Sequence, residues 1–369
     1  MTLYPKLILD ALATVRYPGN GKNLVEADMV DDNMRIEGNK VSFSLLFDKP
    51  TDPFIKSVVK AAETAILTFV SDKVDIVGNI SVNTPEAVKV DEGKLLPQVK
   101  NVIGVSSGKG GVGKSTVASN LAVALAKLGY KVGLLDADIF GPSIPKMFQS
   151  EEARPMIESI GNRELIAPIT KYGVKILSIG FFVDPDQATL WRGGMASNAL
   201  KQLIGDANWG ELDYLLIDMP PGTSDIHLTL VQTLAITGVV VVSTPQDVAL
   251  ADARKGVNMF TNDKVAVPII GLIENMSWFT PAELPENRYY IFGKDGVKKL
   301  AEEMNVKLLG QIPIVQSIRE GGDEGSPVAL NEDSITGAAF KAVAEEVVVQ
   351  VNKRNESQDP TKIVEITSR

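Results

Sequence analysis

Residues 107–116 form a glycine-rich segment whose residue types and spacing suit phosphate binding. The sequence is SGKGGVGKST, and residues 108–115 match G-x-x-x-x-G-K-[ST], a loop whose backbone N–H groups surround nucleotide phosphates. In this pattern Lys114 reaches the β- and γ-phosphates and the Ser115 hydroxyl binds Mg²⁺. The segment therefore predicts a nucleoside triphosphate site. Its expected contacts are Gly108, Lys109, Gly110, Gly111, Val112, Gly113, Lys114, Ser115 and Thr116.

The segments on both sides of this loop support the same prediction. Residues 102–105 are a short apolar run typical of a buried strand, and residues 115–128 are rich in helix formers and end at Gly129. A strand, a glycine loop and a helix N-terminus together direct backbone dipoles at an anion. A glycine-rich turn without a ligand would not account for both flanks.

Lys109 is an additional cation, directly after the first glycine of the loop. A positive charge there suits the negative charge that develops on the phosphates during phosphoryl transfer. The alternative is a solvated loop lysine. P-loop ATPases of the deviant Walker A group carry a signature lysine at this place. Resemblance to that group implies that Lys109 reaches the phosphates bound by a partner subunit, which ties hydrolysis to dimerisation.

Asp218 ends an apolar run, residues 215–217, and is followed by the turn Met-Pro-Pro-Gly at 219–222. P-loop enzymes hold Mg²⁺ with an aspartate at the carboxyl end of a neighbouring strand. We therefore predict that Asp218 supports Mg²⁺ and that the turn after it senses the γ-phosphate. The alternative role for Asp218 is to cap the turn.

Asp136 and Asp138 end the strand that follows the loop helix. By position, Asp138 is predicted to orient the attacking water and Asp136 to support the metal, because phosphoryl transfer needs positioning more than strong basicity. The alternative is that either acid only caps the turn at 141–143. The predicted catalytic residues are thus Lys109, Lys114 and Asp138, and the predicted Mg²⁺ residues are Ser115, Asp136 and Asp218.

Three further polar residues are weaker candidates. Asn275 follows a late strand, where P-loop folds place residues that recognise the base, so a base contact is predicted, with a turn-forming asparagine as the alternative. His227 is predicted to have a structural or surface role. Arg319 faces either the nucleotide, a partner or its own surface neighbours.

Composition excludes several classes of protein and site. The formal net charge of −9 argues against a general nucleic-acid-binding surface. No apolar window of 18 residues occurs and residues 1–18 lack signal-peptide features, so we expect a cytoplasmic protein without a membrane partner. The absence of cysteine excludes disulfides, thiolate zinc sites and cysteine nucleophiles, and a single histidine excludes histidine-rich metal sites.

The order of apolar patterns predicts two domains. Residues 1–83 read as a small α+β domain, with helices at 4–15 and 51–70 and strands at 41–47 and 74–82. A linker is predicted at 84–98. Residues 99–353 alternate buried-strand runs with helices, which predicts a doubly wound, mostly parallel α/β sheet of the P-loop NTPase type. The last helix is predicted at 338–351, before a polar tail at 354–369. The predicted strands are 102–106, 132–135, 174–179, 214–217, 239–243, 269–273 and 307–309.

The motifs resemble, in order, those of the Mrp/ApbC family of deviant Walker ATPases, over about residues 99–350. The matching segments are GKGGVGKST, LLDADIFGPSIP, LWRGGM, DYLLIDMPPGTSDIHLTLVQ, STPQDVALADARKG, IENMSWF, IFGKDG and LLGQIPI. The N-terminal domain is similar in layout to the small domain that precedes many Mrp proteins. The resemblance implies a homodimer that hydrolyses ATP with Mg²⁺ and carries iron–sulfur clusters to apoproteins or helps assemble them. It also implies that Lys109 is the signature lysine and that Asp138 and Asp218 are switch acids.

The chain departs from this family at the cluster site. Family members usually carry Cys-x-x-Cys shortly after the ENMS block, whereas residues 278–287 here read WFTPAELPEN. The N-terminal domain often has a cysteine where residues 48–53 read DKPTDP. Cysteine thiolates normally hold such clusters, so no iron–sulfur ligand is predicted. Glu283 and Glu286 are poor substitutes for soft ligands, and an exposed acidic loop is the simpler interpretation.

Three functional hypotheses follow. The first is an ATPase of iron–sulfur protein maturation, with any cluster held by a partner or only transiently. The second is a nucleotide-gated dimeric adaptor for a protein client, without a cluster. The third, a positioning ATPase related to ParA and MinD, predicts a basic DNA-binding face or a C-terminal amphipathic helix, which the acidic charge and the polar tail disfavour. A nitrogenase-type reductase needs cluster cysteines and is excluded.

Overall fold

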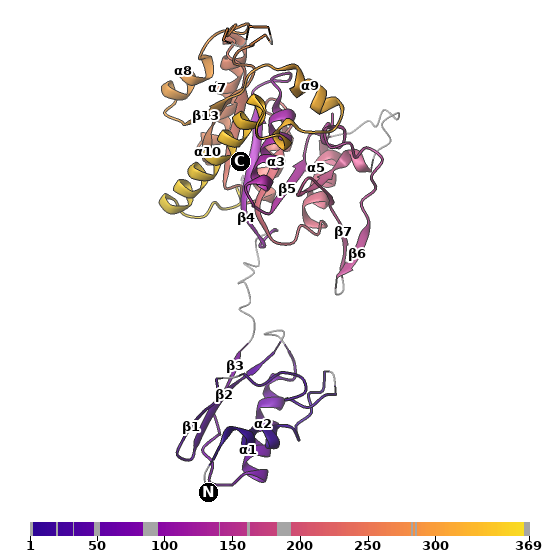
Figure 1. Ribbon diagram of the computed structural model, residues 1–369, viewed down its shortest axis with the longest axis vertical. Coiled ribbons are helices and arrows are strands. Elements are labelled where there is room, and N and C mark those ends of the chain that lie inside the picture. The colour runs from indigo at the N-terminus through magenta and orange to yellow at the C-terminus, as the bar shows by residue number, and fades with distance from the viewer. Residues whose placement is uncertain are drawn as a thin grey trace. The chain divides into compact units, whose positions relative to one another are not determined.

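The computed structural model divides the chain into two compact units, Met1–Glu92 and Gly93–Arg369 (Figure 1). It describes residues 3–19, 21–31, 33–47, 52–83, 95–139, 141–160, 163–182, 193–281, 283–284 and 286–364. Most of the predicted linker, residues 84–94, lies outside these ranges, and its boundaries stay a prediction.

The first unit is a small α+β domain, as predicted. Strands β1 and β2 pair antiparallel, and β2 pairs parallel with β3, while the two helices pack on each other. Ile8, Phe43 and Ile66 are buried in its core, because helix and strand both direct one apolar side inward. The elements are α1 (Pro5–Leu12), β1 (Arg35–Glu37), β2 (Lys40–Leu46), α2 (Ile55–Phe69) and β3 (Ile80–Asn83).

The second unit contains an eight-stranded sheet in the order β13-β12-β11-β4-β10-β5-β9-β8. All neighbours are parallel except β8 and β9, which form an antiparallel edge. The doubly wound, mostly parallel sheet predicted from the sequence is confirmed. The strands are β4 (Val99–Ser107), β5 (Val132–Asp136), β8 (Ile169–Lys171), β9 (Val174–Ser178), β10 (Leu212–Asp218), β11 (Gly238–Ser243), β12 (Ile269–Glu274) and β13 (Leu308–Gln311).

Helices flank this sheet in pairs. The pair α3 and α10 pack on each other and on the strands, as do α7 and α8 (Figure 1). Every residue of β11 is buried, which requires cover on both faces because successive side chains alternate sides. The helices are α3 (Lys114–Lys127), α4 (Ile144–Met147), η1 (Ile179–Phe181), α5 (Gly193–Gly205), α6 (Asp225–Thr233), α7 (Asp247–Thr261), α8 (Gly296–Glu303), α9 (Gln316–Asp323), η2 (Val328–Leu330) and α10 (Ile335–Ser357).

Two features of this unit were not predicted from the sequence. Strands β6 (Ile157–Ile160) and β7 (Arg163–Ile166) form a separate antiparallel hairpin beside the sheet (Figure 1). The antiparallel edge strand β8 was also missed. The three strands β6, β7 and β8 have only three or four residues each, so apolar periodicity has too few positions to reveal them.

The C-terminal helix is longer than the sequence predicted, and the residues after it make more contacts than a polar tail was expected to make. Helix α10 continues to Ser357, and the residues after it fold back along the domain. The Arg354 guanidinium donates to the Asp359 carbonyl and to Thr361 Oγ1, at 2.7 and 2.8 Å, and Val364 N donates to the Val231 carbonyl at 3.0 Å. Residues 354–364 of the predicted polar tail therefore contact the large unit.

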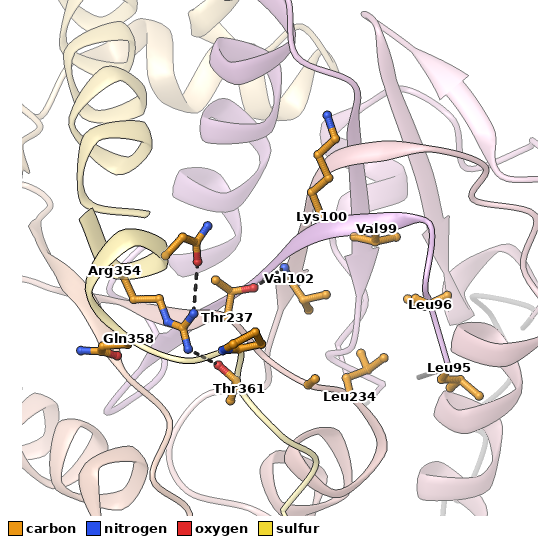
Figure 2. A pocket seen from close by; sticks show the side chains of 13 residues that line it. Leu95, Leu96, Val99, Lys100, Val102, Leu234, Thr237, Arg354, Gln358 and Thr361 are labelled. Atoms are coloured by element: carbon orange, nitrogen blue, oxygen red, sulfur yellow. Dashed lines mark hydrogen bonds between the residues drawn. The ribbon is translucent and has the colours of Figure 1, made fainter. Parts of the chain in front are cut away.

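Figure 2 shows the cavity that this segment helps to line, with Arg354 and Thr361 on one side and Val99 and Lys100 of β4 on another. Its volume is about 250 Å³. It lies at the start of β4, whereas the phosphate-binding sequence follows the end of that strand. No helix in the described part of the chain combines the length and the apolarity needed to cross a membrane.

Candidate functional site

The glycine-rich loop joins the end of β4 at Ser107 to the start of α3 at Lys114. Gly111 and Gly113 have φ angles of +83° and +82°, a left-handed conformation that side chains disfavour. The Ser107 hydroxyl donates to the Lys109 carbonyl at 2.9 Å. This arrangement places the first turn of α3, with its unpaired N–H groups, directly after the loop, as an anion site requires.

Two of the glycines are needed because neighbours approach the backbone closely. A Cβ on Gly108 would lie 2.1 Å from the Asp252 carbonyl carbon of α7, and one on Gly113 would lie 2.3 Å from Asn275 Nδ2. Real side-chain carbons do not occupy such distances. The loop is therefore fixed between α7 and the residue that follows β12.

Lys114 lies at the centre of a buried cluster of predicted site residues. Its Nζ is 2.6 Å from Asp218 Oδ1, 3.1 Å from Ser115 Oγ and 3.8 Å from Asp138 Oδ2. Lys114 is 6% exposed and Asp218 is fully buried. The structure thus brings together four residues that the sequence separates by up to 104 positions.

Asp136 lies beside Asp218, because β5 and β10 pair in the register Asp136 to Asp218. Its carboxylate accepts hydrogen bonds from Ser178 Oγ at 2.9 Å, Asp138 N at 3.1 Å and Ile144 N at 3.3 Å. Burial raises the pKa of Asp136, and the negative charge of Asp218 raises it further. Burial also raises the pKa of Asp218, while Lys114 opposes that shift.

The donor set suits Mg²⁺ held largely by nucleotide phosphates. Asp218 Oδ2 is buried and has no hydrogen-bond partner among the described residues, and the Ser115 hydroxyl lies next to the same lysine. The described residues contain no group of three or more His, Cys, Asp or Glu able to hold a metal by themselves. This agrees with the usual coordination of Mg²⁺, which combines one or two protein oxygens with phosphate oxygens and water. Both oxygens of Asp136 already accept protein hydrogen bonds, so its support is less direct.

Asp138 and Lys109 are more exposed than Lys114 and Asp218. The Asp138 side chain is 16% exposed, and burial raises its pKa while Lys114 lowers it. Lys109 is half-buried, and no hydrogen bond or ion pair joins its ammonium group to a described residue. Lys109 is therefore available to a ligand or a partner.

A cavity of about 610 Å³ opens beside the loop, next to Gly113 and Thr116. Asn275 lies in its wall, and the Asn275 Nδ2 group donates to the Val112 carbonyl at 2.8 Å. The sequence pointed to Asn275 but missed the mainly apolar remainder of the wall. Residues 313–315 could have been found by their position, because they follow β13 in the same way as Asn275 follows β12. The missed residues are Met276, Ile291, Phe292, Pro313, Ile314, Val315 and Ile318.

Arg319 and His227 have mainly local contacts. Arg319 on α9 pairs with Asp323 at 2.8 Å and Glu320 at 3.1 Å, and its side chain also borders the cavity. His227 is buried and closes the N-terminus of α6, where its Nδ1 accepts from Ser224 N at 3.1 Å. Burial lowers its pKa to about 4. The structural role predicted for His227 is confirmed.

Around the position where the resembled family usually carries cysteines, the described residues pair through their backbone. Phe279 and Tyr289 exchange two backbone hydrogen bonds of 2.8 Å, and Arg288 stacks on Trp278 at 4.5 Å from the ring centre. Glu283 and Glu286 are exposed, as predicted for an acidic surface loop. In the N-terminal unit, residues 48–51 of the second expected cysteine region lie outside the described residues.

Comparison with known proteins finds a family match within each unit. The profile of the NUBPL iron-transfer P-loop NTPase family matches residues 98–348, and that of the iron-sulfur cluster assembly protein family matches residues 6–77. An iron-sulfur cluster carrier protein from Synechocystis sp. is 42% identical over 347 residues, covering 94% of this chain and 97% of the relative.

Two further relatives extend this result. The iron-sulfur cluster transfer protein NUBPL from Dictyostelium discoideum is 42% identical over 293 residues, which cover 79% of this chain and 88% of that protein. A nucleotide-binding protein from Archaeoglobus fulgidus, solved in complex with ADP, aligns with a TM-score of 0.54 at 36% identity over 63% of this chain and 88% of that one. The chain therefore belongs to the NUBPL-type iron-transfer P-loop NTPases, the Mrp/ApbC family whose motifs its sequence carries.

Proposed function

We propose that this protein is a homodimeric ATPase that acts in iron–sulfur protein maturation without holding a cluster on cysteines of its own. The observation that supports it most is the buried cluster of Lys114, Asp218, Ser115 and Asp138 at the start of α3. In such a cluster the charges that bind a triphosphate and its metal are already assembled, so little reorganisation accompanies catalysis.

The proposed reaction is hydrolysis of the terminal phosphate. Water attacks the γ-phosphorus, the bond to the bridging oxygen breaks, and ADP and phosphate leave. Lys114 exchanges its contact with Asp218 for the β- and γ-phosphates, and Asp138 orients the attacking water. Ser115 and Asp218, with Asp136 behind them, would hold Mg²⁺, which would supply positive charge to neutralise the phosphates. Most of the rate enhancement then comes from positioning and charge stabilisation.

Adenine is the base that the cavity beside the loop favours. The nitrogen of the Asn275 side chain donates to the Val112 carbonyl, and no described residue donates to its Oδ1, so that oxygen can accept a hydrogen bond from a ligand. The 6-amino group of adenine donates a hydrogen bond, whereas guanine carries an acceptor at the same position. The apolar wall at 313–315 suits the face of a purine ring.

Dimerisation through the loop face is supported by two neighbouring features. The ammonium group of Lys109 has no partner among the described residues, and Val248 in the first turn of α7 is 68% exposed. Helix α7 packs directly on Gly108, so both features lie on the surface around the loop. A second copy that covers this surface would bring Lys109 to the phosphates of its partner, and hydrolysis would then require the dimer.

The iron–sulfur role is proposed from the relatives named as carrier and transfer proteins, together with the matched assembly domain. The chain has no cysteine, so the cluster is written here as cargo whose thiolate ligands belong to a client or another assembly protein. The absence of cysteine also favours a second candidate, a nucleotide-gated adaptor that moves a protein client without a cluster.

The site assignment is tested with Lys109→Ala and Asp138→Ala. We expect Lys109→Ala to lower ATP turnover about 1000-fold, the size of effect seen when a transition-state cation is lost from phosphoryl-transfer enzymes. Asp138→Ala should abolish turnover because the attacking water loses the carboxylate that orients it. Lys131→Ala is the matched control, because Lys131 is an exposed lysine paired with Glu211 on the surface. Sedimentation with and without ATP measures dimerisation in the same samples. Turnover in Lys109→Ala equal to the control would contradict the proposed role of Lys109.

A further inference from the structure

A buried carboxylate outside the phosphate cluster, Glu274, ends β12 immediately before Asn275. Glu274 is fully buried, yet no lysine or arginine of the described chain pairs with it. Its Oε1 accepts from Gln311 Nε2 at 2.7 Å and its Oε2 accepts from Val297 N at 2.7 Å. The charge is therefore stabilised by two N–H donors, one of them in the first turn of α8.

Each contact of Glu274 ties down a segment that forms a wall of the cavity beside the loop. Asn275 is its chain neighbour. Gln311 ends β13 two residues before Pro313, and Val297 is the second residue of α8, five residues after Phe292. The Glu274 backbone carbonyl also accepts from Ile312 N at 2.8 Å. Glu274 thus joins three walls of the cavity that come from three parts of the sequence, two of them through its side chain and the third through its peptide bond to Asn275.

We propose that Glu274 is a positioning residue for nucleotide-base recognition, which holds Asn275, residues 313–315 and the segment ending at Phe292 in the geometry that fits a purine. This rests on the proposed function, since the cavity must be the base site. Glu274 itself contacts neither phosphate nor base in this scheme. Its effect is therefore on affinity for the base and on the choice between bases, while the phosphate contacts of the loop are left intact.

The chemistry of the two contacts explains why a carboxylate is required. Both partners of the side chain are N–H donors, and an ionised carboxylate accepts at both oxygens. A glutamine side chain has one acceptor oxygen and one donor NH₂ group. At one of the two contacts an N–H donor would therefore face another N–H donor. The Gln311 amide cannot simply rotate to accept, because the same nitrogen also donates to Asp295 Oδ1 at 3.1 Å.

The experiment compares ATP with inorganic tripolyphosphate, which carries the phosphates but no base, on the full-length protein with Mg²⁺. For Glu274→Gln we expect ATP affinity to fall roughly tenfold and KM to rise with it, with kcat within about twofold of the original value. We also expect the preference for ATP over GTP to shrink, and tripolyphosphate binding to stay unchanged. Glu274→Ala should lower ATP affinity and the preference for ATP over GTP further, again without a change in tripolyphosphate binding.

Asp295→Asn is the matched control. It removes a carboxylate from the same network, but Asn keeps an oxygen for Gln311 and tolerates the left-handed φ of 56° at this position. Equal loss of ATP and tripolyphosphate binding in Glu274→Gln would indicate a general structural role and overturn the proposal. Unchanged ATP affinity and selectivity would overturn it too. If the unmodified protein binds neither compound, the proposed function itself fails, which is a different result.

Discussion

Single residues of this protein carry charges and hydrogen bonds whose partners come from distant parts of the chain. Lys114 meets Asp218 across 104 positions, and Asn275 meets the Val112 carbonyl across 163. The residue types at 108–116, 136, 138 and 218 were recognisable because each follows a strand and each matches a local motif. Glu274 and Gln311 were not, because a buried Glu–Gln contact has no local pattern and depends on the pairing of β12 with β13.

His227 provides a prediction at this scale, because it is the sole histidine in the sequence. Burial lowers its pKa to about 4 from an ordinary value of 6.5. The unfolded chain then binds more protons than the folded protein between these pH values, so the free energy of unfolding should fall as pH drops from about 6.5 to about 4. The full loss is at most roughly 3 kcal/mol.

Proton NMR measures this directly, since the folded protein should give one imidazole C2–H signal. We expect that signal to stay constant between pH 7.5 and pH 5.5 in the folded protein, and to titrate near pH 6.5 after unfolding in urea. Denaturation curves over the same pH range give the matching change in stability. A folded-state midpoint near 6.5 would show that His227 is accessible to water and would refute its buried capping role.

At the scale of elements, the loop is positioned by what packs on its backbone. The tight approach of α7 to Gly108 and of Asn275 to Gly113 means that a helix and a strand end on either side determine the loop conformation. The sequence predicted the strand–loop–helix order, because apolar runs and helix formers are local signals. It did not predict the contact with α7, because that contact depends on β11 lying next to β4 in the sheet.

Gly108→Ala tests the role of this contact. The added Cβ would lie 2.1 to 2.4 Å from backbone atoms of Asp252 and Ala253, so either the loop or α7 must move. We expect a loss of about 1–3 kcal/mol in the free energy of unfolding, the usual cost of overpacking. Chemical denaturation measures the loss.

Gly110→Ala is the comparison within the same loop, since its Cβ would meet one atom, Pro221 Cγ, at 4.0 Å. That substitution should leave the free energy of unfolding within about 0.5 kcal/mol of the original. Equal stability of the two variants would mean that α7 adjusts freely and does not hold the loop.

At the scale of the whole molecule, an assembled phosphate site occurs in a chain of 369 residues without cysteine. The fold class, the small preceding domain and the family were predictable, because ordered motifs and repeated strand runs extend along most of the sequence. The short hairpin of β6 and β7 and the return of residues 358–364 onto α6 were not, because few residues and long-range contacts define them. The identity of the cargo is likewise not encoded in a local motif.

The missing cysteines lead to a prediction for the protein as a whole. Anaerobic reconstitution with iron and sulfide should give no stable cluster on the isolated protein, because carboxylates are poor ligands for such centres. Visible absorbance together with iron and sulfide analysis measures this. Stoichiometric bound iron with a visible chromophore would mean that ligands other than thiolates hold a cluster.

The same argument separates the two proposed roles. If the cluster is cargo held by other proteins, this chain together with ATP should accelerate cluster transfer from a thiolate-bearing scaffold to an apoprotein. Recovery of the visible spectrum of the acceptor measures the transfer rate. Asp138→Ala should abolish that acceleration, because the dimer would bind ATP without hydrolysing it. An adaptor without a cluster would leave the transfer rate unchanged with or without ATP. The transfer rate therefore distinguishes a role in maturation from an adaptor role, even though neither role requires this chain to supply cluster ligands.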